Sequence, residues 1–211
     1  MGATDLSLHG TLLSGHTHRV ELLLLMLGLP YRFIETPAQV RRSVEFRALN
    51  PLGQIPVLED GELVLADSNA ILVYLAKRYG QGTGWLPEDP LGAARVQRWL
   101  SIAAGEVKYG PGTARLIALW QSPGDPVQAR EIAGDLLRFM NGHLAGRAYL
   151  AADRPTIADL ACYSYVAHAP EGRISLEPYS EVRAWLARVE ALPRFKSMPR
   201  SAVPETRELR R

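Results

Sequence analysis

Hydrophobic and polar positions follow two different periods in the first 35 residues. Residues 6–8 alternate like a short strand, while residues 11–18 are polar and contain a Ser-Gly pair typical of a loop. Residues 19–27 are mostly apolar and precede Gly28, which predicts a buried helix ending there. The β-prone residues 31–34 predict a second strand. This order favours a parallel strand pair joined by a right-handed crossover.

The following pattern predicts a hairpin and another helix. Residues 38–49 are charged and helical toward their end, and two later apolar runs flank an Asp-Gly corner at 60–61. Apolar positions then recur at helical spacing over residues 69–79, with the Asp-Ser pair at 67–68 as the natural N-cap. We therefore expect β-α-β followed by β-β-α, which makes a small four-stranded mixed sheet.

Glycines and prolines interrupt the pattern after this helix. Residues 80–90 contain Gly80, Gly82, Gly84, Pro87 and Pro90, a composition typical of a linker. Beyond them only helical patterns are convincing, at residues 91–109, 113–120, 127–144, 156–168 and 181–192, with Pro111 as an interruption. The predicted fold class is α/β plus all-α, with a first domain over residues 1–80, a linker over 81–90 and an all-helical domain over 91–211.

Composition narrows the class of protein. The 211 residues carry 24 basic and 22 acidic side chains, a net charge of +2 that demands neither nucleic acid nor an anionic membrane. No apolar run approaches the roughly 20 residues of a membrane span, and the N-terminus lacks a secretory pattern. The single cysteine, Cys162, cannot form an internal disulfide and is expected to be a buried, inert thiol. We expect a cytoplasmic protein.

Several kinds of site are unsupported by the sequence. His16 and His18 form the only close histidine pair, and no carboxylate has ligand spacing to them, so we expect no metal site. The Gly-x-Ser-x-Gly elbow of hydrolases and the glycine-rich loops that cradle phosphates are also absent.

The segment Asn-Pro-Leu-Gly-Gln-Ile-Pro-Val-Leu at residues 50–58 is the first functional candidate. Proline cannot donate to a central strand ladder, so Pro56 at a strand start needs a special arrangement. A cis Ile55–Pro56 bond would leave the Ile55 N–H and C=O free to pair with an extended ligand, as in strand addition. An ordinary turn before a strand is the alternative.

Two helix starts are further candidates. At Asp67-Ser68, unpaired N–H groups can bind a carboxylate, and Asp67 can pair with an ammonium group; plain helix capping is the alternative. In the loop at residues 13–20, a hydroxyl can donate to a thiolate near the helix N-terminus and lower the thiol pKa. There the alternative is a simple Ser-Gly turn.

Together these segments resemble the glutathione transferase superfamily. The resemblance rests on residues 13–29, 50–79 and 154–166, and extends to the ending around residues 185–195. It implies a thioredoxin-like first domain followed by a helical domain. It also makes the Pro-Thr-Ile-Ala-Asp run an N-capping box, which agrees with Thr156 as N-cap and Asp159 at the N3 position.

The resemblance implies a role for each motif in binding glutathione. The backbone of Ile55, before Pro56, would pair with the cysteinyl part, and Gln54 commonly contacts the tripeptide. The γ-glutamyl end would be held by Asp67 and Ser68. A basic residue before Asn50 often meets the glycine carboxylate, and here Arg42 or Arg41 is the candidate.

The residue that activates the thiol follows from comparison with the types of the family. The first strand ends in Leu-His-Gly-Thr, without the tyrosine of tyrosine-type members, and the following loop lacks the cysteine of the bacterial cysteine type. The chain therefore resembles a bacterial, serine-type or hydroxyl-type member with Ser14 as the donor. Thr17 and His16 are the alternatives.

The implied activity is attack of the glutathione thiol on a small hydrophobic electrophile, with glutathione as co-substrate and no metal. Glu106, Tyr109 and Arg115 lie on the segment that usually faces the electrophile. A homodimer is expected from the resemblance. A glutathione-dependent disulfide reductase or peroxidase, or a non-catalytic glutathione-binding or interaction module, are the alternatives.

Overall fold

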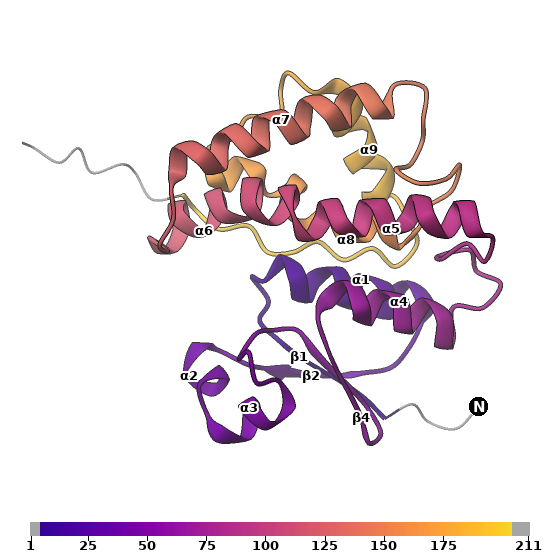
Figure 1. Cartoon of the computed structure of the whole chain (residues 1–211), viewed down its shortest axis with the longest axis vertical. Helices are drawn as coiled ribbons and strands as arrows, with labels where there is room; N and C mark the ends of the chain where they lie inside the picture. Colours follow the sequence, from indigo (N-terminus) through magenta and orange to yellow (C-terminus); the bar gives the residue numbers. More distant parts are fainter. Residues whose placement is uncertain (1–4, 204–211) are drawn as a thin grey trace, which may run out of the picture.

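The computed structural model describes residues 5–203, in two layers of structure (Figure 1). A sheet with its helices occupies the lower part of Figure 1, and a group of helices covers it from above. This confirms the predicted fold class, a thioredoxin-like domain followed by an all-helical domain. The helix α4 ends at Tyr79 and the helix α5 begins at Pro90. The proposed limits of the domains stay predictions.

The sheet is the predicted four-stranded mixed sheet, in the order β2-β1-β3-β4. Its strands are β1 (Leu6–Gly10), β2 (Arg32–Glu35), β3 (Val57–Asp60) and β4 (Leu63–Ala66). The strands β1 and β2 are parallel, as the crossover through the intervening helix requires, and β3 is antiparallel to both of its neighbours. All of β1 is buried, since it is central in the sheet and covered by helices.

The helices of the first domain are α1 (Gly15–Leu27), α2 (Ala38–Arg41), α3 (Val44–Leu49) and α4 (Ser68–Tyr79). The helices α1 and α4 lie between the sheet and the helical domain (Figure 1). The expected loop over residues 11–18 is wrong in its second half, because Ser14 accepts a hydrogen bond from the Thr17 N–H and starts α1 at Gly15. Residues 38–49 form two short helices, α2 and α3, because the Ser43 side chain acts as the N-cap of α3.

The helical domain contains α5 (Pro90–Ala104), α6 (Thr113–Trp120), α7 (Pro126–Leu144), α8 (Ile157–Ala167) and α9 (Ser180–Glu190). A π-helical segment η1 (Lys108–Gly112) precedes α6, and a 3₁₀ turn η2 (Ala169–Gly172) follows α8. The expected interruption of the helical structure at Pro111 is therefore wrong. The segment η1 runs directly into α6, and the Thr113 hydroxyl donates to the Lys108 carbonyl at 3.1 Å.

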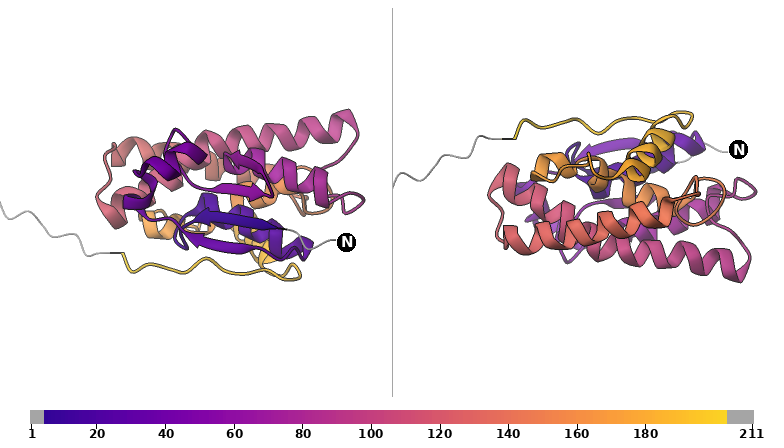
Figure 2. Two further views of the ribbon diagram at one scale, coloured as in Figure 1. Left: turned by 90° about the horizontal axis from the view of Figure 1, so that it is seen from below. Right: turned by 90° about the horizontal axis from the view of Figure 1, so that it is seen from above.

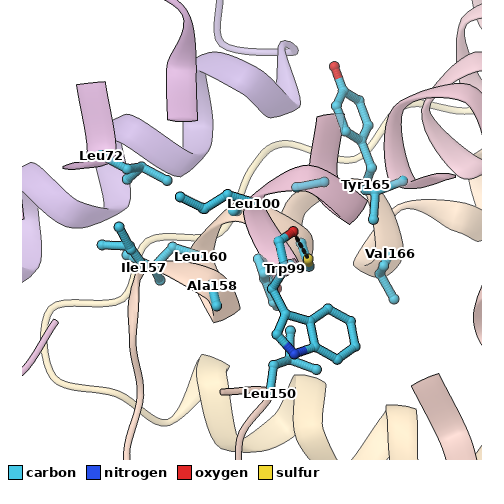
Figure 3. Packing of buried hydrophobic residues seen from close by; sticks show 14 of the residues in the cluster. Leu72, Trp99, Leu100, Leu150, Ile157, Ala158, Leu160, Tyr165 and Val166 are labelled. Carbon is cyan, nitrogen blue, oxygen red and sulfur yellow. Dashed lines mark hydrogen bonds between the residues drawn. The ribbon is translucent and has the colours of Figure 1, made fainter. Parts of the chain in front are cut away.

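The capping box of α8 is confirmed. Thr156 is the N-cap, and both Asp159 carboxylate oxygens accept hydrogen bonds. The helix it starts is buried almost throughout and packs against α1, α4 and α5. Figure 3 shows the side chains at this junction, including Leu72, Trp99 and Leu160. Cys162 lies there too, fully buried, with its thiol directed at the Trp99 carbonyl and its pKa raised by burial to about 12, so it is the inert thiol expected.

The segment after α9, residues 191–203, returns across the first domain (Figure 2). The Lys196 carbonyl accepts a hydrogen bond from His18 Nε2 at 2.8 Å, and the Lys196 ammonium group meets Glu21 at 2.7 Å. Because a carbonyl only accepts, Nε2 of His18 carries the proton and its Nδ1 accepts from the Ser164 hydroxyl at 2.8 Å. A neutral His18 thus ties α1 to α8 and to the returning segment.

The buried His18 predicts a loss of stability in acid. Burial is the main reason that its pKa falls from 6.5 to about 4 in the folded protein. Since the unfolded chain binds this proton more readily, the His18 contribution is complete above pH 6.5 and is lost as the pH falls toward 4. We expect the contribution of His18 to the free energy of unfolding to fall by about 3 kcal/mol between neutral pH and pH values below its folded pKa. Urea unfolding at several pH values measures it.

The control for this prediction is the His18→Gln variant. His16 and His168 also have lowered pKa values, so part of the acid sensitivity of the native protein comes from them. The variant is expected to be less stable at pH 7.5 but to lose less stability on acidification. An identical pH dependence in the two proteins would contradict the assignment to His18.

Candidate functional site

The predicted site residues collect at one edge of the sheet. The strand register pairs His9 with Val57 and Val57 with Ala66, so the end of β1, the start of β3 and the end of β4 are adjacent. The loop before α1, the Ile55–Pro56 segment and the start of α4 continue from these three points. The fold therefore brings together segments that are more than 50 residues apart in the sequence, as for His16 and Ser68.

The segment before β3 has the geometry suggested by the sequence. The Ile55–Pro56 bond is cis, and Gly53 has a positive φ of 62° that glycine adopts readily. The Asn50 side chain holds the turn by donating to the Gln54 carbonyl at 2.8 Å. Within residues 5–203, neither the Ile55 N–H nor its C=O has a backbone partner outside regular elements, and β3 itself begins only at Val57. The Ile55 backbone, just before β3, is thus open to an extended ligand.

The start of α4 combines an exposed carboxylate with a buried hydroxyl. Asp67 is the N-cap, with φ 72°, and one of its oxygens accepts from the N–H groups of Asn69 and Ala70 at 2.8 and 3.0 Å. Ser68 is only 5% exposed. Its hydroxyl lies 3.3 Å from Arg19 Nη1 and 3.4 Å from His16 Nδ1, which connects α4 to the first turns of α1.

A buried arginine beneath Ser68 was missed in the sequence. Arg19 is 0% exposed, and its Nη1 also donates to the Asn69 side chain at 3.0 Å. Its Nε and Nη2 have no hydrogen-bond partner within the described residues, and no carboxylate there lies within ion-pair distance of it. The signal in the sequence that could have indicated it is a charged residue at the start of an apolar run. A buried cation without a contacting anion favours an anionic ligand nearby.

The three candidates for thiol activation differ in their surroundings. Ser14 is half-buried at the N-cap of α1, where its Oγ accepts from the Thr17 N–H at 3.3 Å. Thr17 is 1% exposed and its side chain packs beneath Gly10. His16 is half-buried, and burial together with the nearby Arg19 and Lys108 holds its pKa well below the ordinary value, so it is neutral.

The arginines proposed for the glycine carboxylate lie close to one another at the end of α2. Arg41 is half-buried, with its carbonyl beside Gly53 and its Nε buried without a partner in the described chain. Arg42 is exposed at the C-cap of α2. Gln54 is also exposed. The structure brings Arg41 next to the turn before Ile55, whereas Arg42 lies exposed at the end of α2.

The segment expected to face an electrophile forms one apolar stripe. Tyr109, Leu116 and Trp120 follow one another at helical spacing along η1 and α6, and are 54%, 40% and 46% exposed. Glu106 is exposed, but Arg115 is buried: it pairs with Glu171 at 2.6 Å and donates to the Leu13 carbonyl at 2.8 Å. The second contact fixes this stripe beside the loop that carries Ser14.

The described residues include neither a candidate metal cluster nor a candidate membrane-spanning helix. No cluster of three or more histidine, cysteine, aspartate or glutamate side chains there could hold a metal ion. No helix within residues 5–203 has the length and apolar character needed to span a bilayer.

Comparison with protein families gives a consistent result. Residues 8–83 match the model of the glutathione S-transferase N-terminal domain, and residues 120–193 match that of the C-terminal domain. Glutathione S-transferase 3 of Zea mays is 31% identical over 208 residues, covering 90% of this chain and 91% of the maize protein. Human glutathione S-transferase theta-2 is 31% identical over 178 residues, or 78% of this chain and 71% of the human one.

Solved structures agree with these sequence matches. A glutathione S-transferase from Xanthobacter autotrophicus superposes with a TM-score of 0.84 at 31% identity, covering 92% of this chain and 97% of that one. The theta class glutathione S-transferase of Xanthomonas axonopodis pv. citri, solved with glutathione bound, gives a TM-score of 0.80 at 26% identity, covering 90% and 95%.

Proposed function

The chain belongs to the glutathione S-transferase family, and we propose that it is a serine-type member that binds glutathione at the sheet edge and activates its thiol for attack on a small hydrophobic electrophile. The observation that carries the proposal is the buried Arg19–Ser68 contact at the start of α4. The two unpartnered guanidinium nitrogens and the N-terminus of α4 make this point positive, which suits the γ-glutamyl carboxylate. The exposed Asp67 beside it suits the γ-glutamyl ammonium group.

The other segments would hold the rest of the tripeptide. The N–H and C=O of Ile55, before cis-Pro56, would pair with the cysteinyl backbone as an added strand does, which their lack of other backbone partners supports. Gln54 is exposed next to them and can contact the peptide. For the glycine carboxylate, the position of Arg41 beside Gly53 favours Arg41 over Arg42.

Activation of the thiol would be electrostatic. A free cysteine thiol has a pKa of about 8.5, so only a few per cent is ionised at neutral pH. A hydrogen bond from the Ser14 hydroxyl, together with the N-terminus of α1, stabilises the thiolate and lowers that pKa. Ser14 is favoured over Thr17 because the Thr17 side chain is packed beneath Gly10. The neutral His16 can accept a hydrogen bond there but supplies no positive charge.

The reaction then forms one bond and breaks another. The thiol proton leaves to solvent, and the sulfur attacks the electrophile to form a new bond while a leaving group departs or an acceptor bond opens. The exposed stripe of Tyr109, Leu116 and Trp120 offers an apolar surface for the electrophile beside the Ser14 loop. The homodimer and the cytoplasmic location implied by the family stay predictions.

Calorimetric titration with reduced glutathione tests this function. We expect saturable binding at one site per chain, weakened about tenfold or more in the Ser68→Ala variant, because a hydrogen bond to a charged group is worth about 1.5–3 kcal/mol. The Ser101→Ala variant is the control: Ser101 is exposed on α5 and bonds only its own helix, so its affinity should match the native value. Absence of binding to the native protein would refute the proposal. A preference for glutathione disulfide would favour the reductase.

A further inference from the structure

A tyrosine of the helical domain lies directly on the first turn of α1. Tyr165 on α8 is 5% exposed, and its ring meets the His16 ring edge-on, with centroids 5.0 Å apart at 76°. A methyl group at Gly15 would come within 2.9 Å of Tyr165 Cζ, so glycine is the residue that lets the ring approach this closely. Figure 3 shows the Tyr165 hydroxyl pointing away from Trp99 and Leu150 in the interdomain core.

The surroundings of this hydroxyl suit the recognition of an anion. The backbone N–H groups of Gly15 and His16 and the guanidinium groups of Arg19 and Arg115 are near enough to act on it electrostatically. Those groups lower the pKa of Tyr165, but burial is the larger effect and raises it, so the phenol keeps its proton at neutral pH. Within residues 5–203, no acceptor takes a hydrogen bond from its O–H, which leaves the donor available.

Ser14 and Tyr165 thus reach the same helix end from opposite domains. Ser14 is the N-cap of α1, and Tyr165 contacts the next two residues of the chain. The first N–H groups of a helix lack partners within the helix and attract negative charge. A sulfur anion that accepts a hydrogen bond from the Ser14 hydroxyl at this end of α1 would also lie beside the phenol of Tyr165.

We propose that Tyr165 is a second hydroxyl donor to the sulfur of bound glutathione, so that thiol activation is shared between the two domains. The inference rests on the proposed function, because it assumes that the thiol lies at the start of α1. No covalent step is assigned to the tyrosine. The thiol proton leaves to solvent, Tyr165 keeps its own proton, and its hydrogen bond strengthens as negative charge develops on the sulfur.

The Tyr165→Phe variant tests this proposal with little change in packing. We expect the pKa of the bound thiol, followed by thiolate absorbance, to rise by about one unit, which corresponds to about a tenfold loss in the ionised fraction near neutral pH. The turnover rate should fall by a similar factor at pH 6.5 and recover toward pH 9. The KM for glutathione should change little, because the γ-glutamyl and cysteinyl contacts are intact. A general loss of structure would not produce this pH-dependent recovery.

The matched control is Tyr163→Phe on the same helix. Tyr163 is 3% exposed, and its hydroxyl donates to Glu190 on α9 at 2.9 Å, so removing that hydroxyl while keeping the ring should leave the thiol pKa unchanged. A fluorinated tyrosine at position 165, a stronger donor, should lower the thiol pKa and provides a second variant if Tyr165→Phe folds poorly. A native thiol pKa retained in both Tyr165 variants would overturn the inference while glutathione binding and the role of Ser14 stand. Failure of the native protein to bind glutathione would instead refute the proposed function.

Discussion

Replacing Asp159 by alanine is expected to lower the free energy of unfolding by about 4 kcal/mol, because it leaves several buried donors unpaired at about 1–3 kcal/mol each. Asp159 is 0% exposed. One oxygen accepts from the Leu150 N–H and the Trp185 indole N–H, both at 2.9 Å, and the other accepts from the Thr156 N–H at 2.8 Å. This single carboxylate therefore joins the start of α8 to α9 and to the loop that precedes α8.

Urea unfolding of matched variants measures this effect. The Asp159→Asn variant retains one oxygen for Leu150 and Trp185 but presents an amide to the Thr156 N–H, so it should lose less stability than the alanine variant. The Asp153→Ala variant, in the exposed part of the same loop, should change stability by no more than about 0.5 kcal/mol. A loss below 1 kcal/mol in Asp159→Ala would show that the buried donors find other partners.

Replacing Ser14 by alanine is expected to reduce kcat/KM for glutathione conjugation by about 10²-fold at neutral pH, since it removes a hydroxyl aimed at developing negative charge. The loss should shrink as the pH rises, because more of the bound thiol then ionises without help. The variant should also lose about 1 kcal/mol of stability, since Ser14 caps α1 through the Thr17 N–H. Initial rates over a pH series, with unfolding measured in parallel, separate the two effects.

Two further substitutions distinguish the role of Ser14 in capping α1 from its role in activating the thiol. The Ser14→Asp variant retains an N-cap acceptor but places a carboxylate beside the sulfur, so it should be stable and at least as inactive as the alanine variant. The Ser14→Thr variant keeps both the cap and a hydroxyl and should retain most of the activity. Full activity in Ser14→Asp would mean that Ser14 serves the helix alone, and would move the activating role to another group.

Local chemistry explains which parts of the fold could be predicted. The parallel β1–β2 pair, the hairpin and the capping box follow from short-range patterns that determine local conformation. The start of α1 could not be located because Ser14-Gly15 is equally typical of a turn, and the cap is decided by one side-chain hydrogen bond. The effect of Pro111 was misjudged because a π-helical turn, stabilised by the Thr113 hydroxyl, tolerates it.

The candidate site could be predicted only where a motif is continuous in the sequence. The segments around Ile55 and Ser68 each present recognisable residues at fixed spacing. Arg19 and Tyr165 were missed because each occupies an apolar helix, where the sequence alone does not distinguish a buried functional side chain from core packing. Their importance depends on which helices meet across the domain boundary.

The packing of α1 against α4 and α8 has a consequence for protein synthesis. Val20, Leu23 and Leu72 are 0% exposed in the finished protein, and α8 supplies part of the cover of the helices that carry them. Yet α4 ends at Tyr79 and α8 begins only at Ile157, so the first domain emerges from the ribosome well before that cover has been translated. At a rate of synthesis of about 5–20 residues per second, the nascent chain carries an exposed hydrophobic face for several seconds. That interval is when it most needs chaperones, and a truncated product ending near the linker would keep the face exposed and aggregate.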